Sequence, residues 1–301
     1  MNSNNMTMLI SAFARAYHNA LPEPHVFCDP VARKLFSDEE YCQISETMAG
    51  GIALFCPTFS GTREEALRWI ADHQLSPSPV GRAAFAEQAL ACAVRFGGAK
   101  QVLILAAGLD TFAYRQPEWA SRLAVLEIDL PAVLKEKQER LARGEIAVPE
   151  NVYFVGADFT DAKWTDTLQK CPGFTPNTPT FCSMLGLSYY LSEADLRRML
   201  QAMQTLLPKG STVVFDYPTP ESKTGFDQRQ RRLAAAAGAA MAAGYSETQM
   251  EQLLADCGFL LYEHLAPESI TARFFAAYQS AHPEHPVAAP ESVCYALAVR
   301  Q

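Results

Sequence analysis

The segment from Gln101 to Asp129 constrains this 301-residue chain most strongly. It holds the apolar run QVLIL (101–105), the small-residue turn AAGLD (106–110) and the apolar run LAVLEI (123–128), directly before Asp129. A short apolar run bounded by a turn is typical of a buried strand of a parallel sheet. Asp129 then lies at the carboxyl end of the second strand, where open α/β sheets bind their ligands.

Gly108 and Asp129 have the spacing of a nucleotide-type cofactor site. A glycine lets the backbone approach a ligand closely, and an acid about 20 residues further on can accept hydrogen bonds from ribose hydroxyls. Ala106 and Ala107 fill the turn where the dinucleotide fingerprint G-x-G-x-x-G needs bare backbone, which disfavours a pyrophosphate. The loop therefore predicts an adenosine cofactor without phosphate, such as S-adenosylmethionine.

Composition and charge limit the partners. The net charge is −8 and 49% of the residues are hydrophobic, so we expect a globular protein without nonspecific attraction to nucleic acid or to an anionic membrane. The N-terminus lacks a signal-peptide pattern, and no long apolar run predicts a membrane span. These features predict a cytoplasmic protein, and they leave its oligomeric state open.

Cysteine and histidine patterns do not predict a metal site. The 8 cysteines are scattered along the chain, and we expect reduced thiols at core positions. His282 and His285 stand in HPEHP, where the prolines prevent a helix that would align the two rings. We expect a solvated loop there.

The pattern changes near residue 98. Residues 1–97 contain helical patterns and predict an N-terminal helical cap, while residues 98–301 alternate strand and helix and predict the cofactor-binding domain, the two forming one compact unit. An alanine-rich segment at 229–245 predicts a helix, either packed on the sheet or covering the substrate. Only a loop-like stretch separates the last two expected strands, which favours an antiparallel final strand. Seven strands are expected, at 101–105, 123–128, 152–157, 180–185, 211–217, 259–265 and 293–299.

Four strings resemble the leucine carboxyl methyltransferase-like family of class I S-adenosylmethionine-dependent methyltransferases. They are QVLILAAGLDTFAYR, LEIDLPAVLKEKQERL, GADF and LGLSYYLSEADLRRML, and the similarity covers roughly residues 80–300. Within them, G-L-D-T-x-x-Y-R and E-x-D-x-P-x-x-x-x-x-K are more specific than a glycine loop. The resemblance implies an α/β, Rossmann-like, mostly parallel seven-stranded sheet with a reversed C-terminal strand, and S-adenosylmethionine as cofactor.

The resemblance also implies the cofactor-binding residues. Arg82 would pair with the cofactor carboxylate, Gly108 would lie under the methionine part, Asp129 would bind the ribose, and Asp158 with Phe159 would hold the adenine. The residues themselves leave alternatives open, since Arg82 could cap a surface helix, Asp129 could cap the next helix and Asp158 could be a turn residue.

Three further positions belong to the expected cofactor site. Leu130 follows the ribose acid directly. Ala106 replaces the usual first glycine of the loop, and Leu185 replaces an acid that many relatives carry after the fourth strand. In addition, residues 82–87 read RAAFAE where the family usually has the string R-T-x-x-x-D. Ala83 therefore replaces the threonine, and Glu87 replaces the aspartate.

Methyl transfer from a sulfonium is an in-line displacement that depends on positioning. A carboxylate acceptor is already ionised and needs no general base, whereas a hydroxyl acceptor does. Tyr189 and Tyr190 are the candidate catalytic residues, because an aromatic face stabilises a cation; alternatively one of them packs under the sheet. Three arginines just before the run of alanines could bind an anionic substrate or simply be exposed to solvent. They are Arg229, Arg231 and Arg232.

We therefore expect an S-adenosylmethionine-dependent O-methyltransferase. Its acceptor would be a carboxylate, or a hydroxyl, of a small molecule or of a protein terminus. Two alternatives remain at this point: a binding module that keeps the adenosine site without turnover, and a nicotinamide-dependent dehydrogenase, which the missing glycines disfavour.

Overall fold

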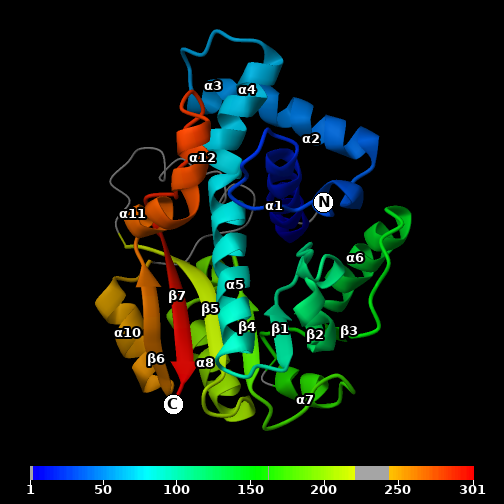
Figure 1. Cartoon of the computed structure of the whole chain (residues 1–301), viewed down its shortest axis with the longest axis vertical. Helices are drawn as coiled ribbons and strands as arrows, with labels where there is room; N and C mark the ends of the chain where they lie inside the picture. Colours follow the sequence, from blue (N-terminus) through cyan, green and yellow to red (C-terminus); the bar gives the residue numbers. More distant parts are fainter. Residues whose placement is uncertain (1–2, 162, 221–243) are drawn as a thin grey trace.

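The computed structural model describes residues 3–161, 163–220 and 244–301 (Figure 1). Seven strands form one sheet in the order β3-β2-β1-β4-β5-β7-β6. All pairs in the series β3-β2-β1-β4-β5 are parallel, and β7 runs antiparallel to both β5 and β6. The strands are β1 Gln101–Leu105, β2 Ala124–Asp129, β3 Val152–Gly156, β4 Thr180–Met184, β5 Thr212–Pro218, β6 Phe259–Leu265 and β7 Val293–Arg300.

This arrangement confirms the predicted sheet and its reversed last strand. Each strand ends within one residue of its predicted bounds. The agreement has a physical cause: β1, β4 and β5 are buried along their whole length, because helices cover both faces of a parallel sheet and its central strands are continuous apolar runs.

Helices cover the two faces of the sheet (Figure 1). One hydrophobic cluster joins one face to α5 and to the C-terminal helical segment that precedes β7, and a second joins the other face to α7, α8 and α10. The α-helices are α1 Ser3–Asn19, α2 Asp38–Gly50, α3 Ile52–Phe55, α4 Arg63–Ile70, α5 Pro77–Arg95, α6 Pro131–Arg143, α7 Trp164–Gln169, α8 Glu193–Leu206, α10 Glu247–Asp256, α11 Pro267–Ile270 and α12 Ala276–Ala281.

Short helical turns connect several of these elements. The 3₁₀ turns are η1 Ala32–Leu35, η3 Phe112–Tyr114, η4 Glu118–Arg122 and η5 Ser188–Tyr190, and the π-turns are η2 Ala71–Leu75 and η6 Thr271–Phe275. Within the described residues, none of the helices is long and apolar enough to cross a membrane.

Helix α5 lies on the sheet, although its sequence belongs to the predicted cap. It packs with β4, β5 and β7 and ends at Arg95, just before the predicted stop at Gly97 and Gly98. Gly98 has a φ of 66°, a backbone conformation that favours glycine. The division into a cap (1–97) and a sheet domain (98–301) remains a prediction.

Three predictions need correction or lie outside the described residues. The loop-like stretch expected before β7 is wrong, because α11, η6 and α12 occupy it and bury Ile270, Phe275 and Tyr278. The thiols are all free, but only Cys182, Cys257 and Cys294 are buried. The predicted alanine-rich helix and its arginines fall almost entirely in the gap at 221–243.

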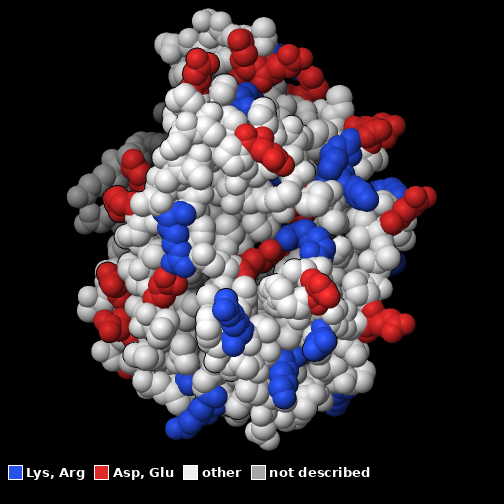
Figure 2. All heavy atoms as spheres, viewed as in Figure 1, with Lys and Arg blue, Asp and Glu red and all other residues white. Residues whose placement is uncertain are grey.

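Charged side chains are unevenly distributed over the face shown in Figure 2. Acidic side chains gather at the α2–α4 end, whereas basic and acidic side chains are interspersed over the lower half. The lower half of this face therefore has no continuous patch of side chains with one sign of charge. The acidic end includes Asp38, Glu39 and Glu40 in the first turn of α2 and Glu64 and Glu65 in the first turn of α4.

A buried histidine lies where α1 meets the C-terminal helices. His18 is fully buried, and its Nε2 accepts a hydrogen bond from the Val26 amide at 3.0 Å. Its ring lies 5.2 Å from that of Tyr278, which in turn lies 4.5 Å from His282. The pKa of His18 is lowered to about 4, chiefly by burial and in smaller part by nearby His25 and Arg68. The solvated loop expected at His282 and His285 is confirmed, since residues 283–286 are exposed, and only the His282 ring is half-buried, against Tyr278 of α12.

The pKa of His18 predicts a loss of stability in acid. The unfolded chain binds a proton near pH 6.5 but the folded protein only near pH 4, so the folded state loses about 3 kcal/mol as the pH falls through this window. Urea unfolding between pH 7 and pH 4 should show this loss in the parent protein and a smaller one in His18→Gln. The exposed His73→Gln should behave like the parent, and parallel curves for all three proteins would contradict the assignment.

Candidate functional site

The candidate site lies at the carboxyl ends of β1 and β4. These strands are neighbours in the sheet, but the chain leaves β1 toward β2 on one side and reaches β4 only later on the other. Such a reversal of strand order opens a crevice beside the carboxyl ends of the strands, where α/β sheets bind ligands. The loop after β1 and the turn η5 after β4 border this position.

Asp129 fixes the loop that follows β1. Its Oδ2 accepts a hydrogen bond from the Gly108 amide at 2.8 Å and its Oδ1 one from the Leu130 amide at 2.7 Å. Burial raises the pKa of Asp129, and these two amides oppose the rise. A carboxylate has about four lone-pair sites, so Asp129 has capacity for further donors such as hydroxyls.

The loop backbone has an unusual conformation at two residues. Gly108 has a φ of 46° and Ala106 a φ of 53°. The left-handed region suits glycine, whereas at alanine it costs about 1 kcal/mol. A Cβ atom added at Gly108 would lie 3.2 Å from Cγ of Met8 on α1. The loop is therefore strained at Ala106 and closely covered at Gly108.

The two most specific sequence strings meet in a buried cluster. Lys137 of α6 forms an ion pair with Glu127 of β2 at 2.7 Å, and both side chains have 0% exposure. The Tyr114 hydroxyl donates to the other Glu127 oxygen at 2.7 Å. Burial raises the pKa of Glu127, and Lys137 opposes the rise. Tyr114 from one string and Lys137 from the other thus compensate the burial of the Glu127 carboxylate.

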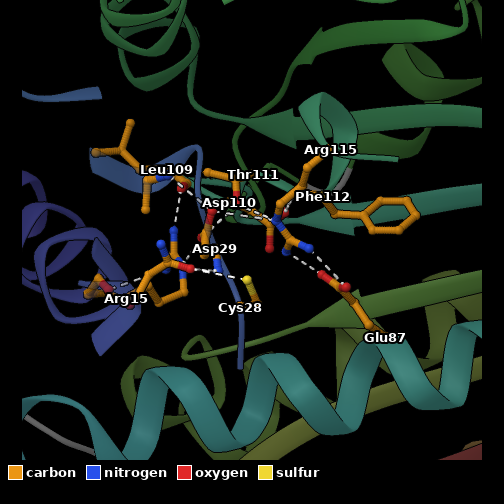
Figure 3. Close-up of polar contacts among 12 residues, drawn as sticks. Arg15, Cys28, Asp29, Glu87, Leu109, Asp110, Thr111, Phe112 and Arg115 are labelled. Atoms are coloured by element: carbon orange, nitrogen blue, oxygen red, sulfur yellow. Dashed lines mark hydrogen bonds and ion pairs between the residues drawn. The ribbon is translucent and has the colours of Figure 1, made fainter. Parts of the chain in front are cut away.

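A second buried cluster joins α1, the segment after it, the loop and α5 (Figure 3). Asp29 accepts hydrogen bonds from Arg15 at 2.9 Å and from the Thr111 hydroxyl at 2.7 Å, and it lies 3.5 Å from Arg115. Arg115 also forms a two-pronged ion pair with Glu87 on α5. The longer acid at position 87 therefore reaches the arginine of the G-L-D-T-x-x-Y-R string.

Arg82 lies in a third cluster, at the end of β4. Its Nη1 donates to Asp216 Oδ2 at 3.2 Å and its Nη2 to Ser11 Oγ at 3.1 Å, and its side chain is 17% exposed. The guanidinium packs against Gly186, where an added Cβ would lie 2.5 Å from Nη1. The alternative that Arg82 caps a surface helix is wrong.

The two candidate tyrosines differ in their surroundings. Tyr189 is buried and its hydroxyl donates to Asp216 Oδ2 at 2.9 Å. Burial and Asp216 hold the pKa of Tyr189 well above its usual value. Tyr190 is 41% exposed, with its ring centroid 6.5 Å from that of Tyr189. Only Tyr190 therefore presents an open aromatic face.

Asp158 and Phe159 follow β3. Asp158 Oδ1 accepts hydrogen bonds from the Thr160 amide at 2.9 Å and from its hydroxyl at 2.7 Å, which lower the pKa of Asp158. The turn interpretation is thus confirmed, and the adenine contact remains a prediction. Phe159 packs edge-on against Trp164 with ring centroids 5.2 Å apart.

A small cavity opens between α5 and the ends of β1 and β4. Its volume is about 20 Å³, enough for one water molecule. Leu130, which follows Asp129, does not line this cavity and is exposed. Leu185 lines this cavity together with the acids Glu87 and Asp110 and with mostly apolar side chains. The lining residues are Ala83, Ala86, Glu87, Leu90, Val102, Ile104, Asp110, Phe112, Phe181, Ser183 and Leu185.

Comparison with known proteins assigns the chain to a family. The family model for leucine carboxyl methyltransferase matches residues 8–204, more than half of the chain. The chain belongs to this family. It is also 36% identical over 302 residues to YktD of Bacillus subtilis (strain 168), named as a candidate S-adenosyl-L-methionine-dependent methyltransferase, over 95% of this chain and 98% of YktD.

Two solved structures share the fold of this leucine carboxyl methyltransferase family member. A DUF574 family protein from Streptomyces avermitilis MA-4680 has a TM-score of 0.59 and 16% identity, covering 97% of each chain. A candidate methyltransferase from Thermobifida fusca YX has a TM-score of 0.55 and 16% identity, covering 96% of this chain and 94% of its own. At such identities the comparison supports the fold alone.

Sequence reasoning missed several residues of these clusters in this family member, including Ser11 beside Arg82. Asp216 is an acid inside the apolar strand STVVFDY, and a charge in a buried strand signals a buried partner. Arg15 lies in α1 and Asp29 precedes a proline in FCDP. Neither has a local signal of its partner, because their contacts join separate parts of the chain.

The Glu127–Lys137 pair predicts a large energetic coupling. Glu127→Gln leaves Lys137 buried without its countercharge and should lower the free energy of unfolding by about 3–5 kcal/mol. The double variant Glu127→Leu/Lys137→Met should be more stable than Glu127→Gln, because no charge remains buried. Urea unfolding measures both changes.

An exposed pair on the same helix provides the control. Lys135 and Glu139 lie 3.9 Å apart and are 78% and 66% exposed, so Glu139→Gln should change the unfolding free energy by less than about 0.5 kcal/mol. Equal effects of Glu127→Gln and Glu139→Gln would show that the buried pair is not needed.

Proposed function

We propose that this protein transfers the methyl group of S-adenosyl-L-methionine to a carboxylate oxygen of a small molecule or a protein terminus. The methyltransferase class follows from membership of the leucine carboxyl methyltransferase family and from similarity to YktD over nearly the whole of both chains. The carboxylate acceptor is the part that rests on the geometry of the site.

The residues at the switch point suit the cofactor. Asp129 has lone pairs left for ribose hydroxyls after binding two amides. Arg82 provides a partly buried guanidinium for the methionine carboxylate, and we assign the methionine part to the loop at Gly108, whose left-handed backbone favours glycine. When bound, S-adenosyl-L-methionine supplies a methyl group activated by its sulfonium.

The remaining predicted residues complete this assignment. We assign the adenine to Asp158 and Phe159, whose turn follows β3, the edge strand next to β2. Asp158 is exposed and so can accept from the adenine amino group, while Phe159 is half-buried beside Trp164. We also assign Ala106, Leu130 and Leu185 to this site, because they follow the carboxyl ends of β1, β2 and β4.

The observation that carries the acceptor assignment is the hydrogen bond from Tyr189 to Asp216. The Tyr189 proton is held by a carboxylate, and burial keeps the tyrosine pKa well above its usual value. Asp216 also accepts from Gly186 and Arg82. Neither group is therefore free to remove a proton from an acceptor at neutral pH, so an acceptor that is already ionised fits this site.

Histidine does not supply the missing base at this edge. The 6 histidines lie on the C-terminal end of α1, in the loop after it, on η2, on β6 and around α12. Among the residues that the structure describes, no hydrogen bond joins a histidine to the loop after β1 or to η5. Positioning by this chain's own residues is thus the main contribution, with Tyr190 offering an aromatic face to the sulfonium.

The pH dependence of turnover and the product's stability test this function. A carboxylic acid is ionised well below neutral pH, so with a mixture of small carboxylic acids and C-terminal peptides as acceptors, turnover should be flat between about pH 6 and pH 8. Tritiated methyl from S-adenosyl-L-methionine should appear in a methyl ester and be released by mild alkali.

A hydroxyl acceptor would give different results. The rate would rise about tenfold per pH unit as a base loses its proton, and the labelled ether would survive alkali. Tyr189→Phe distinguishes the two cases as well, since it should keep most of the activity if Tyr189 is not a base. A loss of about 100-fold or more, with Tyr190→Phe unaffected, would contradict the carboxylate assignment.

A further inference from the structure

One face of α1 covers the candidate cofactor site. Met8, Ser11 and Arg15 are spaced by three and four residues and so lie on the same side of the helix. Met8 lies against Gly108, and Arg15 donates to the Leu109 carbonyl oxygen at 2.6 Å in a buried hydrogen bond. These contacts fix α1 directly over the loop that follows β1.

Ser11 lies between these two contacts and meets Arg82. Its Oγ accepts a hydrogen bond from Nη2 at 3.1 Å. A hydroxyl that accepts in this way keeps its own hydrogen for donation to another oxygen. Ser11 and Arg82 thus place an O–H donor next to a guanidinium that is only 17% exposed.

The charge balance around Arg82 creates a need for such a donor. Asp216, which is fully buried, pairs with Nη1 and offsets the arginine charge. An anion that approaches Arg82 therefore meets a cation and a carboxylate together, and the net attraction is weaker than for an unpaired arginine. An additional neutral donor strengthens anion binding without adding another buried charge.

We propose that Ser11 is a cofactor-binding residue that donates its hydroxyl hydrogen to the α-carboxylate held by Arg82. This proposal rests on the proposed function, because it assigns a second partner to the amino-acid end of S-adenosyl-L-methionine. It extends the cofactor site from the sheet edge to helix α1, with Arg15 and Met8 positioning the helix and Ser11 contacting the ligand.

A pair of ligands tests the role of Ser11. S-adenosylhomocysteine carries the α-carboxylate, whereas 5′-methylthioadenosine has the same nucleoside and thioether without the amino-acid end. Ser11→Ala should raise the Kd of S-adenosylhomocysteine about 10- to 100-fold, the effect of one hydrogen bond to a charged group, and leave that of 5′-methylthioadenosine unchanged. Isothermal titration calorimetry on the full chain measures both values.

Ser45→Ala is the matched control. Ser45 is also a half-buried helical serine, and its hydroxyl donates to the Tyr41 carbonyl oxygen at 2.9 Å on α2. This variant should bind both ligands as the parent protein does. An equal weakening of both ligands by Ser11→Ala would overturn the proposal, because Ser11 would then only support the fold.

Two other results have separate meanings. Unchanged binding of S-adenosylhomocysteine to Ser11→Ala, while the parent binds it normally, would overturn this proposal and leave the proposed function intact. If the parent protein binds neither ligand, the adenosine cofactor site fails, and the proposal about Ser11 fails with it.

Discussion

The carboxylate of Asp129 connects the two segments on which the proposed cofactor site depends. It accepts hydrogen bonds from the amides of Gly108 and Leu130, and so joins the loop after β1 to the end of β2. Both segments start from the centre of a sheet whose strands are held by continuous apolar runs. The loop would otherwise be free to take other conformations, because Ala106 holds a strained left-handed backbone angle.

Three buried clusters then surround this loop, each built around one acid. Glu127 pairs with Lys137, Asp29 with Arg15, and Asp216 is shared by Arg82, Gly186 and Tyr189. A buried charge is tolerated only with partners that compensate the loss of water. Each cluster therefore favours one relative position of the elements that contribute to it.

The sheet could be predicted from the sequence because its signal is local. A run such as QVLIL, short and bounded by a turn, indicates a buried strand from nearby residues alone, whereas α11 and α12 could not be recognised in the same way. Their segment begins without a side-chain cap, and the π-turn η6 interrupts the helical period. Their apolar residues then look like an irregular loop although they pack on α5 and β7.

The site could be predicted only in part. Gly108 and Asp129, which the structure joins by a hydrogen bond, could be paired from the sequence because their separation along the chain follows from a strand pair. Ser11 and Asp216 are 71 and 134 residues from Arg82, so no spacing rule connects them to it. The two adjacent tyrosines gave the same signal, and only tertiary packing directs Tyr189 inward and leaves Tyr190 exposed.

The binding of S-adenosylhomocysteine to Asp129→Ala tests the central assignment most directly. Calorimetry of the parent protein should give one site per chain, and the variant should bind about 10- to 100-fold more weakly, since the ribose hydroxyls and the Gly108 amide lose their acceptor. Asp161→Ala is the control, because Asp161 is exposed and its carboxylate accepts from the nearby Lys163 amide at 2.9 Å. Equal affinity of the parent protein and Asp129→Ala would contradict the placement of the cofactor at this edge of the sheet.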